Sequence, residues 1–176
     1  MTTIEKPKVE DVREIQEVFY KTWLATYPNE EVGITVADIE EKYKNRFSKA
    51  ALEKRRNNIS DKSENSLFLV AKDSGAVVGV CRLKKEENYN ELEAIYVLPS
   101  YQGKGIGKML WDRAVEFLGD KKDVIVHVVT YNEKAINFYK KIGFVDSGKR
   151  FTDEKFKMPI SGSYLPEMEM VIKNKR

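Results

Sequence analysis

The segment 102–107, with the sequence Gln-Gly-Lys-Gly-Ile-Gly, combines residue types that can bind a phosphate group. Gly103, Gly105 and Gly107 are three glycines within five positions, and a residue without a Cβ lets backbone N–H groups approach an anion closely. The segment follows an apolar, strand-like run and precedes a helical pattern. The first N–H groups of a helix have no backbone partners, and the helix dipole favours negative charge there. Together these features predict a site for a phosphate or a pyrophosphate.

Two familiar phosphate loops do not fit this segment. A Walker loop has glycine five positions before its Gly-Lys pair and Ser or Thr after it, but Gln102 and Met109 occupy those two places. The dinucleotide fingerprint G-x-G-x-x-G also differs from the G-x-G-x-G found here. No lone acidic residue ends the next predicted strand to bind a ribose. A phosphate loop of another class and a glycine-rich turn without a ligand both remain open at this point.

Three ionisable residues lie in strand-like runs and are candidates for acid–base chemistry. Glu91 and Glu93 alternate with apolar residues, so both carboxylates share one face of a strand. His127 is the only histidine, and it points to the opposite strand face from Val126 and Val128. Carboxylate and imidazole groups are common general bases, although a solvated strand residue or a structural histidine has the same pattern. No cluster of cysteine, histidine and acidic residues indicates a metal site or a covalent nucleophile.

A helical pattern from about 133 to 142 carries a further candidate. Ala135, Phe138, Tyr139 and Ile142 recur at i, i+3, i+4 and i+7, which is how a core-facing helix surface is spaced. A phenol on such a stripe still needs a polar partner when it is buried. Tyr139 is therefore either a core residue or a proton donor at a site.

Hydrophobic periodicity and turn residues predict the elements that must position these residues. The predicted strands cover about 2–6, 67–71, 77–83, 91–97, 124–129, 145–151 and 167–172. The predicted helices cover about 8–25, 35–56, the stretch from the glycine-rich loop to 118, and 133–142. Thr35 and Asp38 form a weak capping box at the start of the second helix. A longer loop, 152–166, separates the last two strands.

The order of these elements predicts the fold class. The strand 91–97, the helix that ends near 118 and the strand 124–129 should form a right-handed parallel β-α-β unit. The flanking hairpins make the sheet mixed, so we expect an α/β (α+β) fold. Its ligand should bind at the carboxyl ends of the parallel strands, where the helix also begins. A chain of 176 residues can fill one core and is too short for two ordinary domains, so residues 1–176 are expected to form one domain.

Two blocks of sequence resemble the GNAT superfamily of N-acetyltransferases. The first is similar to motif A of that family and consists of Ile95-Tyr96-Val97 followed by Gln102-x-x-Gly105-x-Gly107. The second resembles motif B and reads Asn132-x-x-Ala135-x-x-Phe138-Tyr139-x-x-x-Gly143-Phe144. The blocks occur in the family's order, separated by one predicted helix and one predicted strand. The resemblance covers about residues 67–144.

The resemblance implies a single sheet of six or seven strands with about four helices and with strands 92–97 and 124–129 splayed apart. Acetyl-CoA, as co-substrate, would enter this gap, with its pantetheine arm along the first strand and its pyrophosphate on the loop amides. The residues expected to contact it are Ile95, Tyr96, Val97, Gln102, Gly103, Lys104, Gly105, Ile106, Gly107, Lys108 and Asn132. Lys104 and Lys108 would neutralise phosphates, or are solvated surface residues. Asn132 would also cap the following helix.

The resemblance also implies roles in direct acetyl transfer to an amine within a ternary complex. Tyr139 stands where similar enzymes place a tyrosine near the sulfur of CoA, and it would protonate the leaving thiolate. Glu93 matches a carboxylate of GNAT polyamine acetyltransferases, and Glu91 aligns with the base of GNAT histone acetyltransferases. His127 is similar to a histidine that acts through water in enzymes acetylating protein N-termini. All three remain candidates for the general base.

The acceptor pocket is expected to lie against the N-terminal helices and the late loop. The residues considered for its wall are Trp23, Tyr27, Glu30, Glu31 and Tyr164. The chain most resembles small bacterial GNAT proteins, including polyamine acetyltransferases, so the expected acceptor is a small primary amine. A protein N-terminus or lysine is the alternative acceptor, and a non-catalytic acyl-CoA sensor is the alternative to an enzyme.

Composition limits the other partners. The net charge is only +3 and basic residues alternate with acidic ones, which argues against a nucleic-acid-binding face. No apolar run approaches the ~18 residues of a membrane span, and the first residues lack the layout of a secretion signal. Cys81 is the single cysteine, which favours a reducing cytoplasm. We expect a cytoplasmic monomer or homodimer without a metal.

Overall fold

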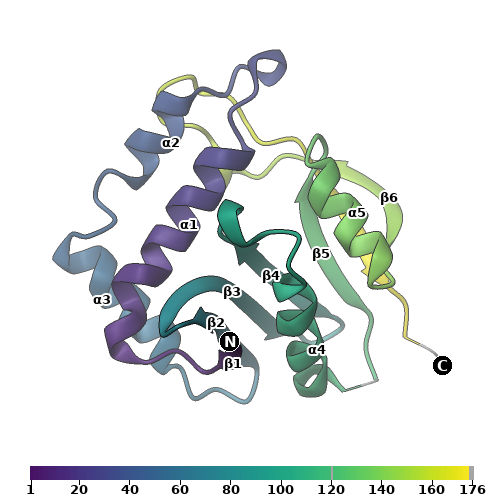
Figure 1. Ribbon diagram of the computed structural model, residues 1–176. Helices are drawn as coiled ribbons and strands as arrows, with labels where there is room; N and C mark the ends of the chain where they lie inside the picture. The colour runs from purple at the N-terminus through teal and green to yellow at the C-terminus, as the bar shows by residue number, and fades with distance from the viewer. Residues whose placement is uncertain (120, 175–176) are drawn as a thin grey trace.

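The computed structural model describes residues 1–119 and 121–174 and contains one seven-stranded mixed sheet (Figure 1). The strand order across the sheet is β1-β2-β3-β4-β5-β7-β6. The strands are β1 (Thr2–Glu5), β2 (Ser66–Asp73), β3 (Ala76–Lys85), β4 (Asn90–Val97), β5 (Val124–Val129), β6 (Val145–Phe151) and β7 (Glu167–Ile172). The sequence-predicted strands are confirmed, with differences of a few residues at their ends.

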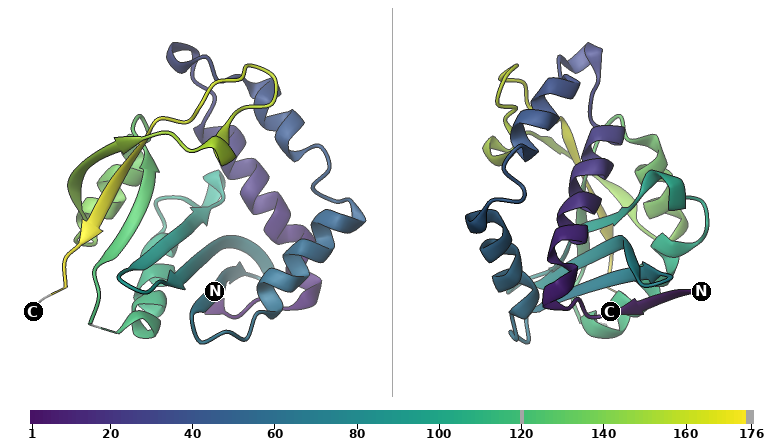
Figure 2. Two further views of the ribbon diagram at one scale, coloured as in Figure 1. Left: turned by 180° about the vertical axis from the view of Figure 1, so that it is seen from behind. Right: turned by 60° about the vertical axis from the view of Figure 1, so that its left-hand side comes forward.

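Five α-helices within the described residues cover the two faces of this sheet. They are α1 (Val12–Thr26), α2 (Val36–Tyr43), α3 (Lys49–Ser60), α4 (Ile106–Leu118) and α5 (Glu133–Lys141). Short 3₁₀ turns lie at Val9–Asp11, Glu30–Val32, Pro99–Tyr101 and Glu154–Phe156. The helices α1, α2 and α3 lie on one face, and α4 and α5 lie on the other (Figure 2). No helix in the described part of the chain is long and apolar enough to cross a bilayer.

The prediction of one helix over 35–56 is wrong, which is why the described chain has five α-helices where about four were expected. The chain forms α2 and α3 instead, because the connecting segment is used in tertiary contacts. The side chain of Gln16 donates to the carbonyl of Arg46 at 3.0 Å, which holds this carbonyl towards α1. Ser48 then begins a new helix by accepting a hydrogen bond from the Ala51 N–H at 3.2 Å.

The predicted start of α2 is confirmed. The Thr35 side chain accepts from the Asp38 N–H at 3.2 Å, and Asp38 accepts from the Thr35 N–H at 2.9 Å. Asp38 is fully buried and also accepts from the N–H groups of Ile160 and Ser161, at 3.0 Å and 2.8 Å. These hydrogen bonds lower the pKa of Asp38 far below its ordinary value, although burial acts in the opposite direction. One carboxylate therefore ties the late loop to α2.

The parallel pair β4–β5 is hydrogen-bonded over only part of its length. Asn90 to Leu92 pair with Val124 to Val126, and no pairing follows beyond Leu92 in the described sheet. The rest of β5 stays paired with β7, while the rest of β4 stays paired with β3. Figure 1 shows the two strands diverging from this point. The splay predicted for these strands is therefore confirmed, and it leaves one edge of β4 open.

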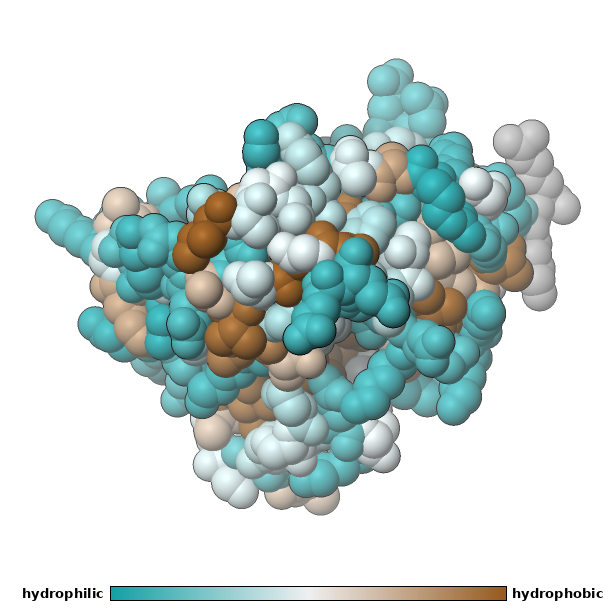
Figure 3. Space-filling model, turned by 90° about the horizontal axis from the view of Figure 1, so that it is seen from above, coloured by the Kyte–Doolittle hydropathy of each residue, from teal (hydrophilic) through white to brown (hydrophobic). Residues whose placement is uncertain are grey.

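Apolar residues fill both sides of the sheet. One cluster packs α4 and α5 on the sheet and includes Leu110, Trp111, Phe144 and Met170. Two further clusters lie under α1, α2 and the late loop. Cys81 is buried, as expected for a small apolar residue, and burial raises the pKa of its thiol to about 12. Seen from above, the surface is mainly hydrophilic, with apolar side chains in separate patches (Figure 3).

Candidate active site

A cleft of about 620 Å³ lies where β4 and β5 separate. It is lined by β4, the glycine-rich loop, the start of α4, the middle of β5, the start of α5 and the end of α1. The lining residues are Thr22, Thr26, Tyr27, Glu93, Ile95, Tyr96, Val97, Pro99, Tyr101, Gln102, Gly103, Gly105, Ile106, Gly107, Lys108, Val126, His127, Val128, Asn132, Lys134, Ala135, Phe138 and Tyr139. The two sequence blocks, far apart in the chain, thus form opposite walls of one cleft.

The glycine-rich loop presents a helix start without a side-chain cap. Gly105 is the N-cap of α4 in the left-handed conformation, with φ of 80°, and no side chain of the described residues caps it. No atom lies within 4 Å of the position that a Cβ on Gly103 or Gly105 would occupy. Gly107 is different, because its Cβ would meet the Phe138 ring at 3.2 Å. The loop is therefore shaped to leave its amides free on the outside and to pack against α5 on the inside.

The polar side chains of this loop differ in where they lie relative to the cleft. Lys108 lines the cleft, and its ammonium group pairs with Asp112 at 2.6 Å on the exposed surface of α4. Lys104 lies outside the cleft lining, with its ammonium 4.6 Å from the centre of the Tyr101 ring. Gln102 folds back and donates its side-chain amide to the Val97 carbonyl at 3.0 Å.

The open edge of β4 can accept an extended chain. Ile95, Tyr96 and Val97 line the cleft. On the edge away from β5, these residues pair with β3, and Ile95 lies opposite Cys81. Because pairing with β5 stops at Leu92, the backbone groups of the inner edge have no partner strand. An extended ligand with amide groups can add to such an edge as a further strand does.

Tyr139 belongs both to the core and to the cleft. Its side chain is 6% exposed, and its ring makes edge contacts with Phe138 and Phe144 at 5.5 Å between centroids. Burial raises the pKa of the Tyr139 phenol far above its ordinary value, and the partly buried Tyr96 adds to this shift. The phenol therefore keeps its proton at neutral and mildly alkaline pH. Asn132 caps α5, since its side-chain oxygen accepts from the Ala135 N–H at 3.2 Å, and it also lines the cleft.

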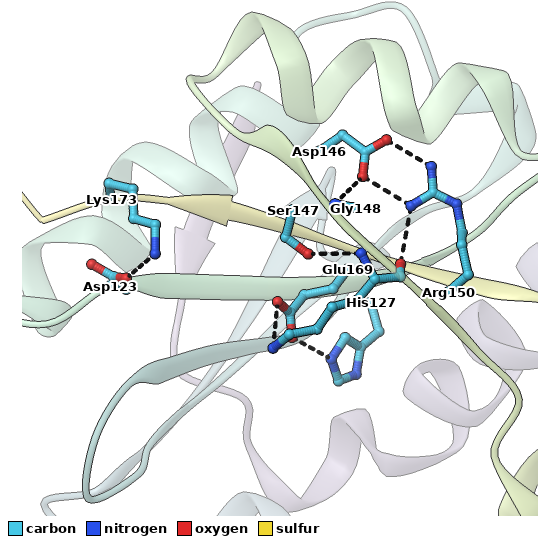
Figure 4. Close-up of polar contacts among 9 residues, drawn as sticks. Asp123, His127, Asp146, Ser147, Gly148, Arg150, Glu169 and Lys173 are labelled. Carbon is cyan, nitrogen blue, oxygen red and sulfur yellow. Dashed lines mark hydrogen bonds and ion pairs between the residues drawn. The ribbon is translucent and has the colours of Figure 1, made fainter.

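The three candidate bases are brought to one side of the cleft. Glu93 lines the cleft and pairs with Arg82 at 3.0 Å. His127 also lines the cleft, with Nδ1 3.9 Å from Glu91. Its Nε2 atom lies 3.7 Å from Glu169 (Figure 4). Glu91 lies outside the lining and reaches the cleft through His127.

Of the five residues considered for the acceptor wall, only Tyr27 lines the cleft. Trp23 is 5% exposed and packs edge-on against Tyr27 at 4.7 Å, so it supports the wall from behind. Glu30 and Glu31 lie in the 3₁₀ turn that follows α1, outside the lining. Tyr164 also lies outside the lining and donates to Glu154 at 2.9 Å.

Several lining residues were not anticipated. Thr22 and Thr26 face the cleft from α1, and their i, i+4 spacing on a largely apolar helix is the signal that could have found them. Glu167, at the start of β7, is buried outside the lining and was not anticipated either. Among residues 1–119 and 121–174, no group of three or more His, Cys, Asp or Glu side chains could hold a metal ion.

A seven-stranded mixed sheet with splayed parallel strands over an uncapped helix start defines the class of the protein as a GNAT-type acyltransferase. In agreement, residues 15–144 match the model of the Acetyltransferase (GNAT) family. The chain belongs to this family and is an N-acetyltransferase.

Individual relatives agree with this assignment. The chain is 33% identical to the spermidine N(1)-acetyltransferase of Thermoplasma acidophilum over 147 residues, which cover 80% of this chain and 86% of that protein. It is 31% identical to the peptidyl-lysine N-acetyltransferase YjaB of Salmonella typhimurium over 91 residues, 52% of this chain and 58% of that protein. The crystal structure of the PaiA N-acetyltransferase from Thermoplasma acidophilum in complex with coenzyme A superposes with a TM-score of 0.72. The sequence identity is 26%, and the match covers 98% of this chain and 99% of that chain.

Proposed function

We propose that this N-acetyltransferase transfers an acetyl group from acetyl-CoA directly to a primary amine, and that the acceptor is a polyamine. The observation that carries the proposal is the combination, in one cleft, of an uncapped helix start, an open strand edge and a buried phenol. The similar spermidine N(1)-acetyltransferase and the similar structure in complex with coenzyme A support the same acceptor class and co-substrate.

The residues of the cleft fit acetyl-CoA. The amides of residues 103–107 and the start of the α4 dipole would hold its diphosphate, with Lys108 beside them. The inner edge of Ile95 to Val97 would pair with the amide groups of the pantetheine arm. Acetyl-CoA supplies an activated acetyl group as a thioester.

Tyr139 would act as the general acid. As the amine nitrogen bonds to the acetyl carbon and the carbon–sulfur bond breaks, the phenol donates its proton to the leaving sulfur. Burial keeps this phenol protonated, which a proton donor requires. The proton lost by the amine nitrogen must pass to a base on the other side of the cleft.

The geometry divides the base candidates into two groups. Glu93 and His127 contact the cleft directly, whereas Glu91 would act only through His127. Glu93 is engaged by Arg82, so His127 is the side chain with the freer access to an incoming amine. We propose His127, directly or through a water molecule, as the residue that receives the proton.

Thermal stabilisation by CoA tests the co-substrate. Ligand at ~100 times its Kd should add roughly 2.7 kcal/mol to the free energy of unfolding, whereas ATP and NAD should add much less. Equal stabilisation by all three, or none by CoA, would contradict the proposal.

A panel of acceptors tests the second half of the proposal. The enzyme is incubated with acetyl-CoA and either spermidine or lysine-containing and N-terminal peptides, and the products are identified by mass spectrometry. Acetylated spermidine with unmodified peptides is the expected result. The similarity to a peptidyl-lysine N-acetyltransferase makes modified peptides with unmodified spermidine the specific alternative outcome.

A further inference from the structure

Glu167 is a buried carboxylate for which the mechanism above has no use. It is 6% exposed, and its Oε2 atom has no hydrogen-bond partner among the described residues. A buried charged oxygen without a partner is costly, and most such groups in proteins have one. Glu167 therefore needs an explanation.

The register of the sheet places Glu167 on the acceptor side of the cleft. Glu167 lies opposite Val129 and Glu169 lies opposite His127, so both glutamates share the face of His127. This is the face covered by α1 and α2, because Val129 packs in the cluster under these helices. The cofactor loop and α4 lie on the other face.

The charged groups around Glu167 come from several elements. Arg82 on β3 pairs with Glu93 on β4, and Lys149 on β6 pairs with Glu169, each at 3.0 Å. In the late loop, Lys155 pairs with Asp153, also at 3.0 Å.

On this face, Glu91 and Glu167 form no ion pair with a lysine or arginine among the described residues. The Nδ1 atom of His127 lies 3.9 Å from Glu91, and the Oε2 atom of Glu167 has no hydrogen-bond partner among them. The negative charges of the two carboxylates repel each other, and the charge of Glu91 contributes to the raised pKa of Glu167. These pairs therefore leave two carboxylates of the face unmatched by a lysine or arginine.

The charge of Glu167 acts on a residue of the cleft wall. Burial raises the pKa of Tyr96, and the negative charge of Glu167 contributes to this shift. Tyr96 and His127 both line the cleft, whereas Glu91 and Glu167 lie outside its lining. Burial also raises the pKa of Glu167 to about 7, with Lys155 opposing and Asp153 and Glu91 reinforcing the shift.

We propose that Glu167, together with Glu91, binds a second, non-reacting ammonium group of the acceptor; this inference rests on the proposed amine-acetylating function. The nitrogen that reacts must be neutral, whereas every other amino group of a polyamine keeps its proton at neutral pH. Such a group supplies the positive charge and the hydrogen-bond donors that Glu167 lacks. The two carboxylates then select acceptors with at least two amino groups.

The test compares two acceptors of equal chain length, 1,4-diaminobutane and 1-aminobutane, in the native enzyme and in Glu167→Gln. Losing hydrogen bonds to a charged group should lower the kcat/KM ratio of diamine to monoamine roughly 10–100-fold. The KM for acetyl-CoA and the kcat with the monoamine should not change. Glu91→Gln should lower the ratio less, and the matched control Glu87→Gln, in an exposed loop, should leave it unchanged.

The outcomes separate this inference from the proposed function. If the native enzyme acetylates the diamine but Glu167→Gln keeps the native ratio, the ammonium site is wrong and the function stands. An equal loss for both amines also contradicts the site, because it places the effect on the reacting nitrogen. A native enzyme that binds CoA but neither acetylates the diamine nor gains thermal stability from it in the CoA complex contradicts both.

Discussion

The two sides of the cleft are built in different ways. On the cofactor side, one continuous stretch, 95–107, supplies a strand edge and a helix start, and its contacts are mainly backbone groups. On the acceptor side, α1, β4 and β5 each supply one or two side chains to the lining, and Glu167 of β7 is buried outside it. Substitutions in the stretch 95–107 should therefore disrupt cofactor binding as a whole. A substitution on the acceptor side should change the contact of a single side chain. This difference explains why the family of the chain is easier to establish than its acceptor.

The two sides also differ in charge. Uncapped amides and Lys108 favour an anion on the cofactor side. Glu91 and Glu167 favour a cation on the acceptor side. Tyr139 stands between them as a neutral proton donor. Substitutions should therefore affect one side without the other.

The largest effect is expected for Gly105→Val on the cofactor side. A branched side chain at φ of 80° is strained and covers the amides that would hold the diphosphate. Losing two hydrogen bonds to a charged group, at about 1.5–3 kcal/mol each, should weaken CoA binding roughly 1,000-fold. Isothermal titration with CoA measures this change.

The control for this substitution is Gly75→Val. Gly75 has φ of 88° and an equally open surrounding, but it lies in the β2–β3 turn. This variant should lose stability by a similar amount and keep the native affinity for CoA. Equal loss of affinity in both variants would indicate unfolding and remove the special role of Gly105.

The next largest effect is expected for Tyr139→Phe, at the boundary of the two sides. Loss of a general acid should lower kcat roughly 100-fold, while the affinity for CoA stays unchanged. Since burial raises the pKa of Tyr139 far above its ordinary value, the native kcat should show no decline from this group up to at least pH 9. Tyr89→Phe, in an exposed loop, is the control. Unchanged turnover in Tyr139→Phe across the alkaline range would exclude it as the proton donor.

On the acceptor side, Glu167→Gln should change the pH dependence of stability. The pKa of Glu167 is raised from 4.5 to about 7 in the folded protein, so ionisation costs stability as pH rises from about 4.5, and the full cost is reached above about 7. Glutamine removes this cost, so at pH 8 the variant should be more stable by on the order of 2 kcal/mol, and at pH 4 it should gain nothing.

Denaturant unfolding at the two pH values measures the effect, with Glu87→Gln as the control for net charge. A variant that is less stable than the native protein at pH 8 would show that Glu167 already has a strong partner within the protein.

The smallest effect is expected for Asp38→Asn, which loosens the late loop. The amide cannot accept all the hydrogen bonds that the buried carboxylate receives from Thr35, Ile160 and Ser161, which should cost about 1–2 kcal/mol of stability. The KM for the acceptor should rise a few-fold, whereas CoA binding should not change. Asp61 accepts hydrogen bonds only from its near neighbours Ser63 and Ser66. Asp61→Asn should therefore change neither the KM for the acceptor nor the affinity for CoA. A loss of CoA affinity in Asp38→Asn would show that the two sides are not independent.

Local pattern was enough to predict most elements and the cofactor side. The hairpin turn at Asp73–Ala76, the capping box of Thr35 and the helix after Gly105 depend on neighbouring residues, and all are present in the structure. Gly105 and Tyr139, which the sequence singles out by residue type at a fixed spacing, both line the cleft. Local pattern predicted a single helix between 35 and 56, which is wrong. The residues of that segment do not show that the distant Gln16 side chain donates a hydrogen bond to the carbonyl of Arg46.

The sequence by itself determined the order of the strands and helices, the glycine-rich helix start and the stripe that carries Tyr139, because these depend on conformational preferences over a few residues. Only the tertiary structure decided that pairing of β4 with β5 ends at Leu92, that Trp23 packs edge-on against Tyr27, and that Glu167 is buried without a partner for its Oε2 atom. The physical reason is that burial and charge pairing depend on which distant segments meet. The sequence pattern around a strand glutamate is the same whether its carboxylate faces water, an arginine or an empty cation site.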